Sequence, residues 1–283
     1  MIGVLDIGGT HVTAARVELA SCAVDPDSRC RIALAPDGTR EELLGGILRA
    51  AAAAASPAIR RWGVASAGPF DYENGICRIR GVGKLDALYG VDLRREFATA
   101  LGLDDPGLVR FLNDAEAFLL GEAWAGAARG HARAVGLTLG TGLGSAFLAD
   151  GRIVRDGPGV FPGGDAHVVD FRGRPVEETI SRRGLLAGYG GDGALDVREI
   201  ADRARSGERG ARTTFDEFAA ALVEFLTPWL DAFAPTCVVV GGSIARAWDL
   251  IGPVLERALP TAGVTVAENI DDAPLLGAAR YAA

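Results

Sequence analysis

A buried strand followed by a glycine-rich turn occurs three times in this chain. The turns are Asp6-Ile7-Gly8-Gly9-Thr10, Leu139-Gly140-Thr141-Gly142-Leu143-Gly144 and Val240-Gly241-Gly242-Ser243. Glycine leaves backbone N–H groups open to an approaching polyphosphate. The first two turns lead from strand to strand, whereas dinucleotide-binding turns and P-loops lead from a strand into a helix. They predict two phosphate-binding hairpins, one from each half of the chain, on either side of a cleft. Each turn alone is also what an ordinary tight hairpin contains.

The hydrophobic periodicity predicts an α/β chain. Strands are expected at residues 2–6, 11–19, 61–65, 108–112, 134–139, 145–149 and 237–240, and helices at 40–55, 91–101, 115–128, 177–186, 197–204, 214–233, from 245, and at 274–281. The glycine-rich stretch 156–174 is typical of a binding loop.

Length and composition narrow the functional class. The 283 residues, 49% of them hydrophobic and 23% charged, suffice for one large domain or two modest ones. The formal net charge of −8 argues against a nucleic-acid-binding surface. No apolar run approaches the roughly 20 residues of a membrane span, and Met1 leads directly into a strand rather than a leader peptide. We therefore expect a cytoplasmic protein without nucleic-acid or membrane partners.

The four cysteines are Cys22, Cys30, Cys77 and Cys237, and they show neither CxxC nor CxC spacing. This pattern is a poor zinc signature and a poor disulfide framework for a chain of this length.

The order of the motifs resembles one known family. D-x-G-G-T near residue 10, N-D near 113, G-T-G-x-G near 140 and G-G-S near 241 resemble the ROK family of sugar kinases and repressors, and residues 272–279 are similar to its C-terminal signature. The resemblance implies the two-lobed, actin-like ATPase (ribonuclease H-like) fold. It places the lobes at residues 1–112 and 113–283, with the final helix returning to the first lobe. It also suggests a homodimer.

The same resemblance implies ATP and Mg²⁺ as cofactors and assigns the glycine turns to nucleotide binding. Asp6, beside the first turn, can orient Mg²⁺-bound water, and the hydroxyls of Thr10 and Thr141 can donate hydrogen bonds. Three sets of residues would hold the nucleotide: Gly8, Gly9 and Thr10 on the β- and γ-phosphates, Gly140, Thr141, Gly142 and Gly144 on the same phosphates from the other lobe, and Gly241, Gly242 and Ser243 at the adenosine.

The Asn113-Asp114 pair carries the predicted chemistry. In the family's pattern Asp114 is the general base that takes the proton from the attacking sugar hydroxyl, and Asn113 binds a neighbouring hydroxyl. The pair also suits the N-terminus of the following helix, and both interpretations can hold together. Gly68 matches a family turn at the sugar pocket, although a turn that merely ends a strand fits it equally.

The chain departs from the family around the expected sugar pocket. Family kinases usually read G-E-x-G-H, then a zinc-binding cysteine cluster, then E-x-x-x-S. Here His167 is in register with the family's histidine, but Gly164 occupies the glutamate position, and only Asp165 could substitute. Residues 169–175 contain no cysteine, so we predict no structural zinc.

Two carboxylates compete for the remaining sugar-binding role. Glu177 matches E-x-x-x-S and is the preferred ligand, Glu178 is one residue out of register, and either could be an exposed carboxylate at a helix start. The family's asparagine before G-V-D-L is absent from residues 81–85.

These observations predict an ATP-dependent kinase for a small sugar, either a hexose or an N-acetylhexosamine. The alternative is a catalytically weak or inactive sugar or nucleotide sensor. Asp114 favours the kinase, because a sensor needs no base.

Overall fold

The computed structural model describes residues 1–81, 83–190 and 195–283, and these form two compact units. Unit 1 comprises Met1–Ala125 and Asp272–Ala283, and unit 2 comprises Gly126–Asp271. Each unit is built around one five-stranded mixed sheet.

The sheet of unit 1 has the strand order β3-β2-β1-β4-β7. Its strands are β1 (Ile2–Ile7), β2 (His11–Glu18), β3 (Ala23–Ala33), β4 (Trp62–Ser66) and β7 (Val109–Asn113). β1 pairs antiparallel with β2 and parallel with β4, and β4 pairs parallel with β7. Two small strands, β5 (Phe70–Asp71) and β6 (Ile76–Cys77), form a separate hairpin.

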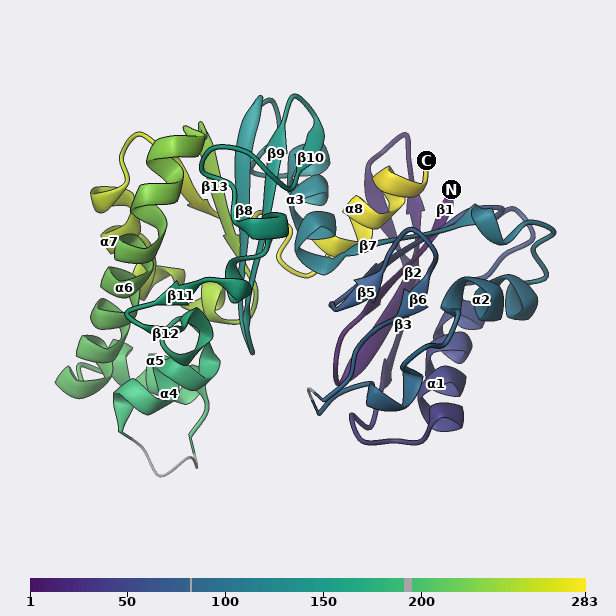
Figure 1. Ribbon diagram of the computed structural model, residues 1–283, viewed down its shortest axis with the longest axis horizontal. Coiled ribbons are helices and arrows are strands. Elements are labelled where there is room, and N and C mark those ends of the chain that lie inside the picture. Colours follow the sequence, from purple (N-terminus) through teal and green to yellow (C-terminus); the bar gives the residue numbers. More distant parts are fainter. Residues whose placement is uncertain (82, 191–194) are drawn as a thin grey trace. The chain divides into compact units, whose positions relative to one another are not determined.

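Alternating side chains of β1 pack on opposite faces of this sheet. Leu5 and Ile7 join the core that includes residues of α1 (Arg40–Ala54) and α2 (Leu93–Leu101), while Ile2 and Val4 join the core formed with α8 (Ala273–Ala282). Figure 1 shows α1 and α2 on one side of the sheet and α8 on the other. The strand period of two therefore gives β1 two buried faces.

Unit 2 repeats this strand arrangement with the order β10-β9-β8-β13-β14. Its strands are β8 (Arg133–Leu139), β9 (Leu143–Ala149), β10 (Arg152–Val154), β13 (Cys237–Gly241) and β14 (Val264–Val266). β8 pairs antiparallel with β9 and parallel with β13. The helices α4 (Arg182–Tyr189), α5 (Val197–Arg205), α6 (Arg209–Phe233) and α7 (Trp248–Ala258) contribute to its single large core. Each unit thus sets an antiparallel hairpin beside parallel strands.

The first unit extends through α3 (Asp114–Ala125), beyond the boundary expected at residue 112. The reason is the packing of α3 against α8. A methyl group on Gly277 would overlap the carbonyl oxygen of Ala117, and one on Gly121 would overlap that of Ala273. The two helices therefore touch through their backbones, which ties α3 to the unit that holds α8.

Several elements differ from the sequence-based expectation. β3, β10 and β14 were not expected, and the sequence of β3 contains Pro26 and several polar residues, which are uncommon in strands. The helix expected from Glu177 begins at Arg182, because Ser181 Oγ accepts a hydrogen bond from Gly184 N and caps it there. Residues Val176–Glu178 form a separate 3₁₀ turn.

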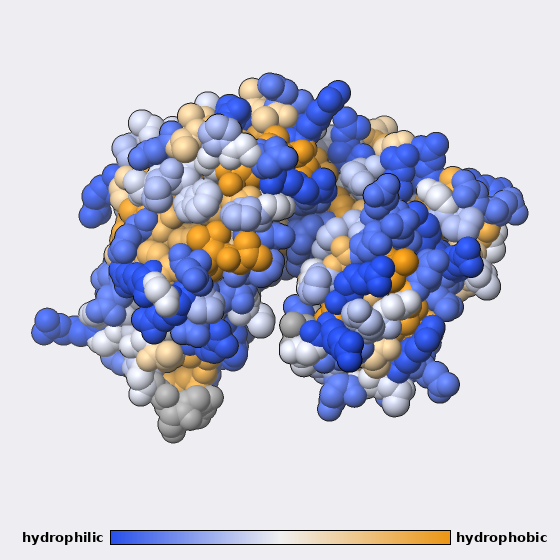
Figure 2. Space-filling model, in the orientation of Figure 1, coloured by the Kyte–Doolittle hydropathy of each residue, from blue (hydrophilic) through white to orange (hydrophobic). Residues whose placement is uncertain are grey.

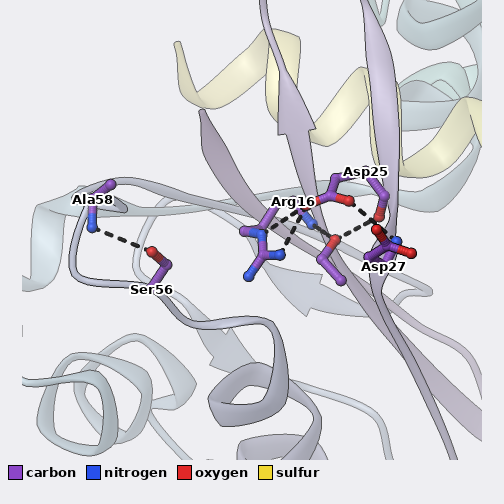
Figure 3. Close-up of polar contacts among 6 residues, drawn as sticks. Arg16, Asp25, Asp27, Ser56 and Ala58 are labelled. Carbon is purple, nitrogen blue, oxygen red and sulfur yellow. Dashed lines mark hydrogen bonds and ion pairs between the residues drawn. The ribbon is translucent and has the colours of Figure 1, made fainter.

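A bulge explains how β3 tolerates its polar sequence. The register between β2 and β3 shifts after Ala14, and polar contacts hold the extra residues (Figure 3). The Arg16 guanidinium donates to Asp25 Oδ2 at 2.8 and 3.0 Å. The buried Ser28 hydroxyl accepts from Arg16 N at 2.8 Å and donates to Asp25 O at 2.6 Å.

The surface is mainly hydrophilic on the face shown in Figure 2, with smaller hydrophobic patches. Met1, Tyr89, Val168 and Tyr281 are the exposed large hydrophobic side chains among the described residues. No helix in the described ranges is both long and apolar enough to cross a membrane.

Candidate active site

The parallel strands of unit 1 end together beside the predicted catalytic residues. Ile7 of β1 is paired with Ser66 of β4, and Ser66 is paired with Asn113 of β7. Asp6 precedes Ile7, and Asp114 follows Asn113. Since ligands of open α/β sheets bind outside the carboxyl ends of the strands, this edge is the candidate active site of unit 1.

Asp6 and Asp114 lie close enough to interact electrostatically. Burial and the negative charge of Asp114 raise the pKa of Asp6 to about 7, against the opposite effect of Arg31. A carboxyl group that titrates near neutrality beside a second carboxylate is typical of a functional site. Sequence spacing of more than a hundred residues gave no sign of this coupling.

Asn113, rather than Asp114, caps α3. Its Oδ1 accepts hydrogen bonds from Ala115 N at 2.8 Å and Glu116 N at 3.3 Å. Asp114 is the first residue of the helix, and its Oδ1 accepts from Ala115 N at 2.9 Å. The positive end of the helix dipole therefore acts on Asp114 and favours its ionised form.

Tyr72 joins this edge and was not anticipated from the sequence. Its hydroxyl donates to Ser66 O at 3.0 Å and accepts from Asn113 Nδ2 at 3.2 Å. A Cβ on Gly68 would lie 3.3 Å from the same hydroxyl. Tyr72 thus links the turn at Gly68 to Asn113. Its position just after the Gly68-Pro69 turn is the only local signal.

The first glycine turn forms a tight hairpin at the end of β1. Gly8 N donates to His11 O at 3.0 Å, and Thr10 Oγ1 shares a hydrogen bond with His11 Nδ1 at 3.2 Å. Gly8 and Gly9 are half-buried and Thr10 is exposed. Burial, reinforced by Arg31, lowers the pKa of His11, so its imidazole is neutral at pH 7.

In unit 2 the two other glycine turns lie next to each other. β8 and β13 are parallel, with Thr138 paired to Gly241, so both turns follow the same edge. Gly242 has a φ of +84° and sits against the backbone of Leu139, where a methyl group would overlap the carbonyl oxygen. A Cβ on Gly140 would lie 3.5 Å from Ser243 Oγ. Glycine is therefore required at 242 by both conformation and space.

Glu177 contacts the G-T-G-L-G turn directly. Its Oε1 accepts a hydrogen bond from Leu143 N at 2.9 Å, and a methyl group on Gly142 would overlap this oxygen. Arg182 N donates to Gly140 O at 2.7 Å, which fixes the same turn from α4. Glu177 is half-buried and Glu178 is exposed. Of the two competing carboxylates, only Glu177 reaches this turn.

The loop expected to contact the sugar is held to β9 by a buried serine. Ser145 Oγ donates to Gly164 O at 2.6 Å and accepts from Ala166 N at 2.8 Å. Asp165 is half-buried, and His167 is exposed. Ser145, missed in the sequence, positions this loop, while the side chains of Asp165 and His167 remain candidate sugar ligands.

No group of three or more His, Cys, Asp and Glu side chains within the described ranges could hold a metal ion. None of the four cysteines, all of which lie in the described ranges, forms a disulfide.

Several known proteins are similar to this chain in sequence and structure. A sequence model described as "ROK family" matches residues 2–283. The glucokinase of Thermotoga maritima is 33% identical over 250 residues, which cover 77% of each chain. The N-acetyl-D-glucosamine kinase of Pectobacterium carotovorum is 32% identical over 205 residues, or 65% of this chain and 66% of that protein. A ROK family glucokinase from Streptomyces griseus, solved with glucose and AMPPNP, has a TM-score of 0.79 at 25% identity and covers 98% of this chain and 97% of its own.

Proposed function

This chain belongs to the ROK family and is an ATP-dependent sugar kinase with the two-lobed actin-like fold, and we propose that Asp114 is its general base. The observation that carries this assignment is the meeting of Asp6, Asn113 and Asp114 at the carboxyl edge of one sheet. The helix dipole of α3 favours an ionised Asp114, which a base requires.

In the proposed reaction the sugar hydroxyl attacks the γ-phosphorus of ATP. Its proton passes to the Asp114 carboxylate, the new O–P bond forms, and the bond to the bridging oxygen breaks, so that ADP leaves with the electron pair. Asn113 Nδ2 donates one N–H to the Tyr72 hydroxyl. Because the amide group is planar, this hydrogen bond also fixes the direction of the second N–H of Asn113. We assign Asn113, and the turn at Gly68, to orientation of the sugar.

The sugar ligands assigned to unit 2 are Asp165, His167 and Glu177. Glu177 is supported by its half-buried carboxylate beside Gly142, and Asp165 by the anchored loop that carries it. The substrate class that follows is a hexose or an N-acetylhexosamine, the two sugar types named among the relatives.

Backbone amides and hydroxyls of the glycine turns are assigned to the nucleotide. In unit 1 Gly8, Gly9 and Thr10 bind phosphate. In unit 2 the assigned phosphate residues are Gly140, Thr141, Gly142 and Gly144, and the adenosine residues are Gly241, Gly242 and Ser243. The support is the position of these residues in turns at strand ends, where all of them except the buried Gly241 are half-buried or exposed.

Asp6 fits a role toward Mg²⁺. Its carboxylate adjoins the first phosphate turn, and Mg²⁺ prefers oxygen ligands while keeping several of its waters. When bound with ATP, Mg²⁺ would neutralise charge on the phosphates. Asp6 would hold the ion through those waters, and it must be ionised to do so.

We further propose a cytoplasmic homodimer, as the family resemblance suggests.

The pH dependence of nucleotide binding tests the role of Asp6. Because the pKa of Asp6 is about 7, this carboxyl is mostly protonated at pH 6 and mostly ionised at pH 8. We expect MgAMPPNP to bind about 10-fold more tightly at pH 8 than at pH 6. Calorimetric titration at both pH values measures this ratio. Asp6→Asn should bind more weakly and lose the pH dependence, and an unchanged ratio in that variant would reject the assignment.

The same shift has the opposite effect on stability. A folded-state pKa raised from 3.8 to about 7 means that the folded protein holds this proton more tightly than the unfolded chain. Asp6 therefore contributes stability that is complete below pH 3.8 and is lost as the pH rises through about 7.

A coupled ADP-release assay with MgATP tests the proposed function across hexoses, hexosamines and their N-acetyl derivatives. We expect turnover that depends on one of these sugars. If the folded protein binds ATP and a sugar but forms no ADP with any of them, the chain is a sensor and the catalytic assignment fails.

A further inference from the structure

Lys84 is the only lysine among the 29 lysine and arginine residues of this chain. An arginine spreads its charge over a planar fork, whereas a lysine ends in a compact ammonium ion on a flexible stem. Lys84 lies in unit 1, after the hairpin of β5 and β6 and just before the 3₁₀ turn η1 (Asp86–Leu88).

The stem of Lys84 lies on the first glycine turn. A Cβ built on Gly9 would be 2.7 Å from Lys84 Cδ, 3.4 Å from its Cβ and 3.6 Å from its Cγ. The methylene groups of Lys84 therefore occupy the space that any other residue at position 9 would fill. Because the ammonium nitrogen is only two bonds beyond Cδ, its charge stays beside this turn.

The segment around Lys84 is anchored on both sides. Leu85 is buried in the core of unit 1, and its N–H donates to Pro36 O at 3.1 Å. Asp86 Oδ2 accepts from Gly81 N at 3.1 Å. Leu85 also adopts a φ of +56°, a conformation that a leucine holds only when its surroundings impose it. The position of Lys84 over Gly9 is thus built into the fold.

The charge of Lys84 has no carboxylate partner among the residues that the structure describes. None of the ion pairs found there includes it, although twelve arginine-to-carboxylate pairs do form. Lys84 is half-buried, so its stem is covered while its end can reach a ligand.

We propose that Lys84 binds the terminal phosphoryl group of the phosphate donor at the Gly8–Thr10 turn. This inference rests on the proposed function of that turn as a phosphate site. An ammonium ion adds charge to amide donors that are neutral, and it favours the phosphoryl oxygens as negative charge shifts during transfer. A nucleoside triphosphate and an inorganic polyphosphate share this terminal group.

Selective acylation of amines tests the proposal without reference to activity. Lys84 is the one lysine side chain of the sequence, and the α-amino group of Met1, which precedes β1, serves as the internal reference. Cleavage at arginine isolates Lys84 in the peptide 81–94. With saturating MgAMPPNP we expect Lys84 to be acylated at least about 10-fold more slowly, and Met1 at an unchanged rate.

The choice of ligands separates the possible donors. MgADP lacks the terminal phosphate and should protect Lys84 much less than MgAMPPNP, and protection by inorganic tripolyphosphate alone would point to a polyphosphate donor. Equal acylation rates with and without bound MgAMPPNP, or equal protection by MgADP, would overturn the proposal.

Binding by variants gives a second readout. Lys84→Gln should weaken MgAMPPNP by about 10- to 100-fold while changing MgADP by less than about 3-fold, and Lys84→Arg should recover part of the loss. The matched control is Arg80→Gln, because the exposed Arg80 lies in the same segment and stacks 5.3 Å from the ring of Tyr89. The control should bind both nucleotides as wild type does.

Failure of the Lys84 proposal can be distinguished from failure of the proposed kinase function. A wild-type protein that forms no ADP would reject the proposed function, yet protection of Lys84 by MgAMPPNP would still support its phosphate contact. Unchanged nucleotide affinities in Lys84→Gln would reject the contact while leaving sugar-dependent turnover intact.

Discussion

Asp114→Asn is expected to lower kcat for sugar-dependent ADP formation by about 10²- to 10⁴-fold. The substitution removes the proton acceptor but keeps the size of the side chain and the oxygen that accepts from Ala115 N at 2.9 Å. The fold and the cap of α3 should therefore remain. Steady-state kinetics on the best sugar, with AMPPNP affinity measured in parallel, separates lost chemistry from lost binding.

Asp114→Asn should also change the pH dependence of nucleotide binding. Since the charge of Asp114 helps to raise the pKa of Asp6, its removal should move the pH midpoint of MgAMPPNP binding downward from about 7. Asp104→Asn, an identical change at an exposed position of unit 1, is the control and should alter neither quantity. Turnover of Asp114→Asn within about 10-fold of wild type would mean that another group takes the proton.

Gly277→Ala is expected to destabilise unit 1 by at least about 3 kcal/mol. The added methyl group would overlap the Ala117 carbonyl oxygen and approach Gly121 N at 2.9 Å. These are backbone atoms, so relief requires α3 and α8 to separate. Urea unfolding followed by far-UV circular dichroism measures the loss as a lower midpoint.

Gly45→Ala in α1 is the matched control, because the only atom near its new methyl group is Arg49 Nη1 at 3.2 Å, the end of a flexible side chain. Alanine is the better helix former there, so the control should gain up to about 1 kcal/mol. If both variants unfold at the same urea concentration, the close approach of α3 and α8 is not a determinant of stability.

The catalytic and nucleotide motifs illustrate what local sequence can reveal. Glycine turns after apolar strands predicted β1, β8 and β13 and the hairpins that follow β1 and β8, because those turns need no distant partner to form. The family resemblance, confirmed over residues 2–283, supplied the fold and the kinase activity. The residue roles that it implied remain predictions.

Contacts between distant segments were invisible in the same sequence. The sequence around Tyr72 does not predict its hydrogen bond to Asn113, and the sequence around Lys84 does not predict that its side chain lies over Gly9. The first compact unit extends to Ala125 for a related reason, since the glycines that let α3 and α8 touch lie 156 positions apart, at Gly121 and Gly277.

The sequence by itself determined β1, β4, β7, β8 and β13 and the glycine-rich turns after β1, β8 and β13, because hydrophobic period and glycine chemistry act within a few residues. Only the tertiary structure decided which charges meet. It brought Asp6 beside Asp114, Glu177 onto the Gly142 turn and Lys84 onto Gly9. A pKa and a binding charge depend on burial and neighbours in space, and those follow from packing rather than from position along the chain.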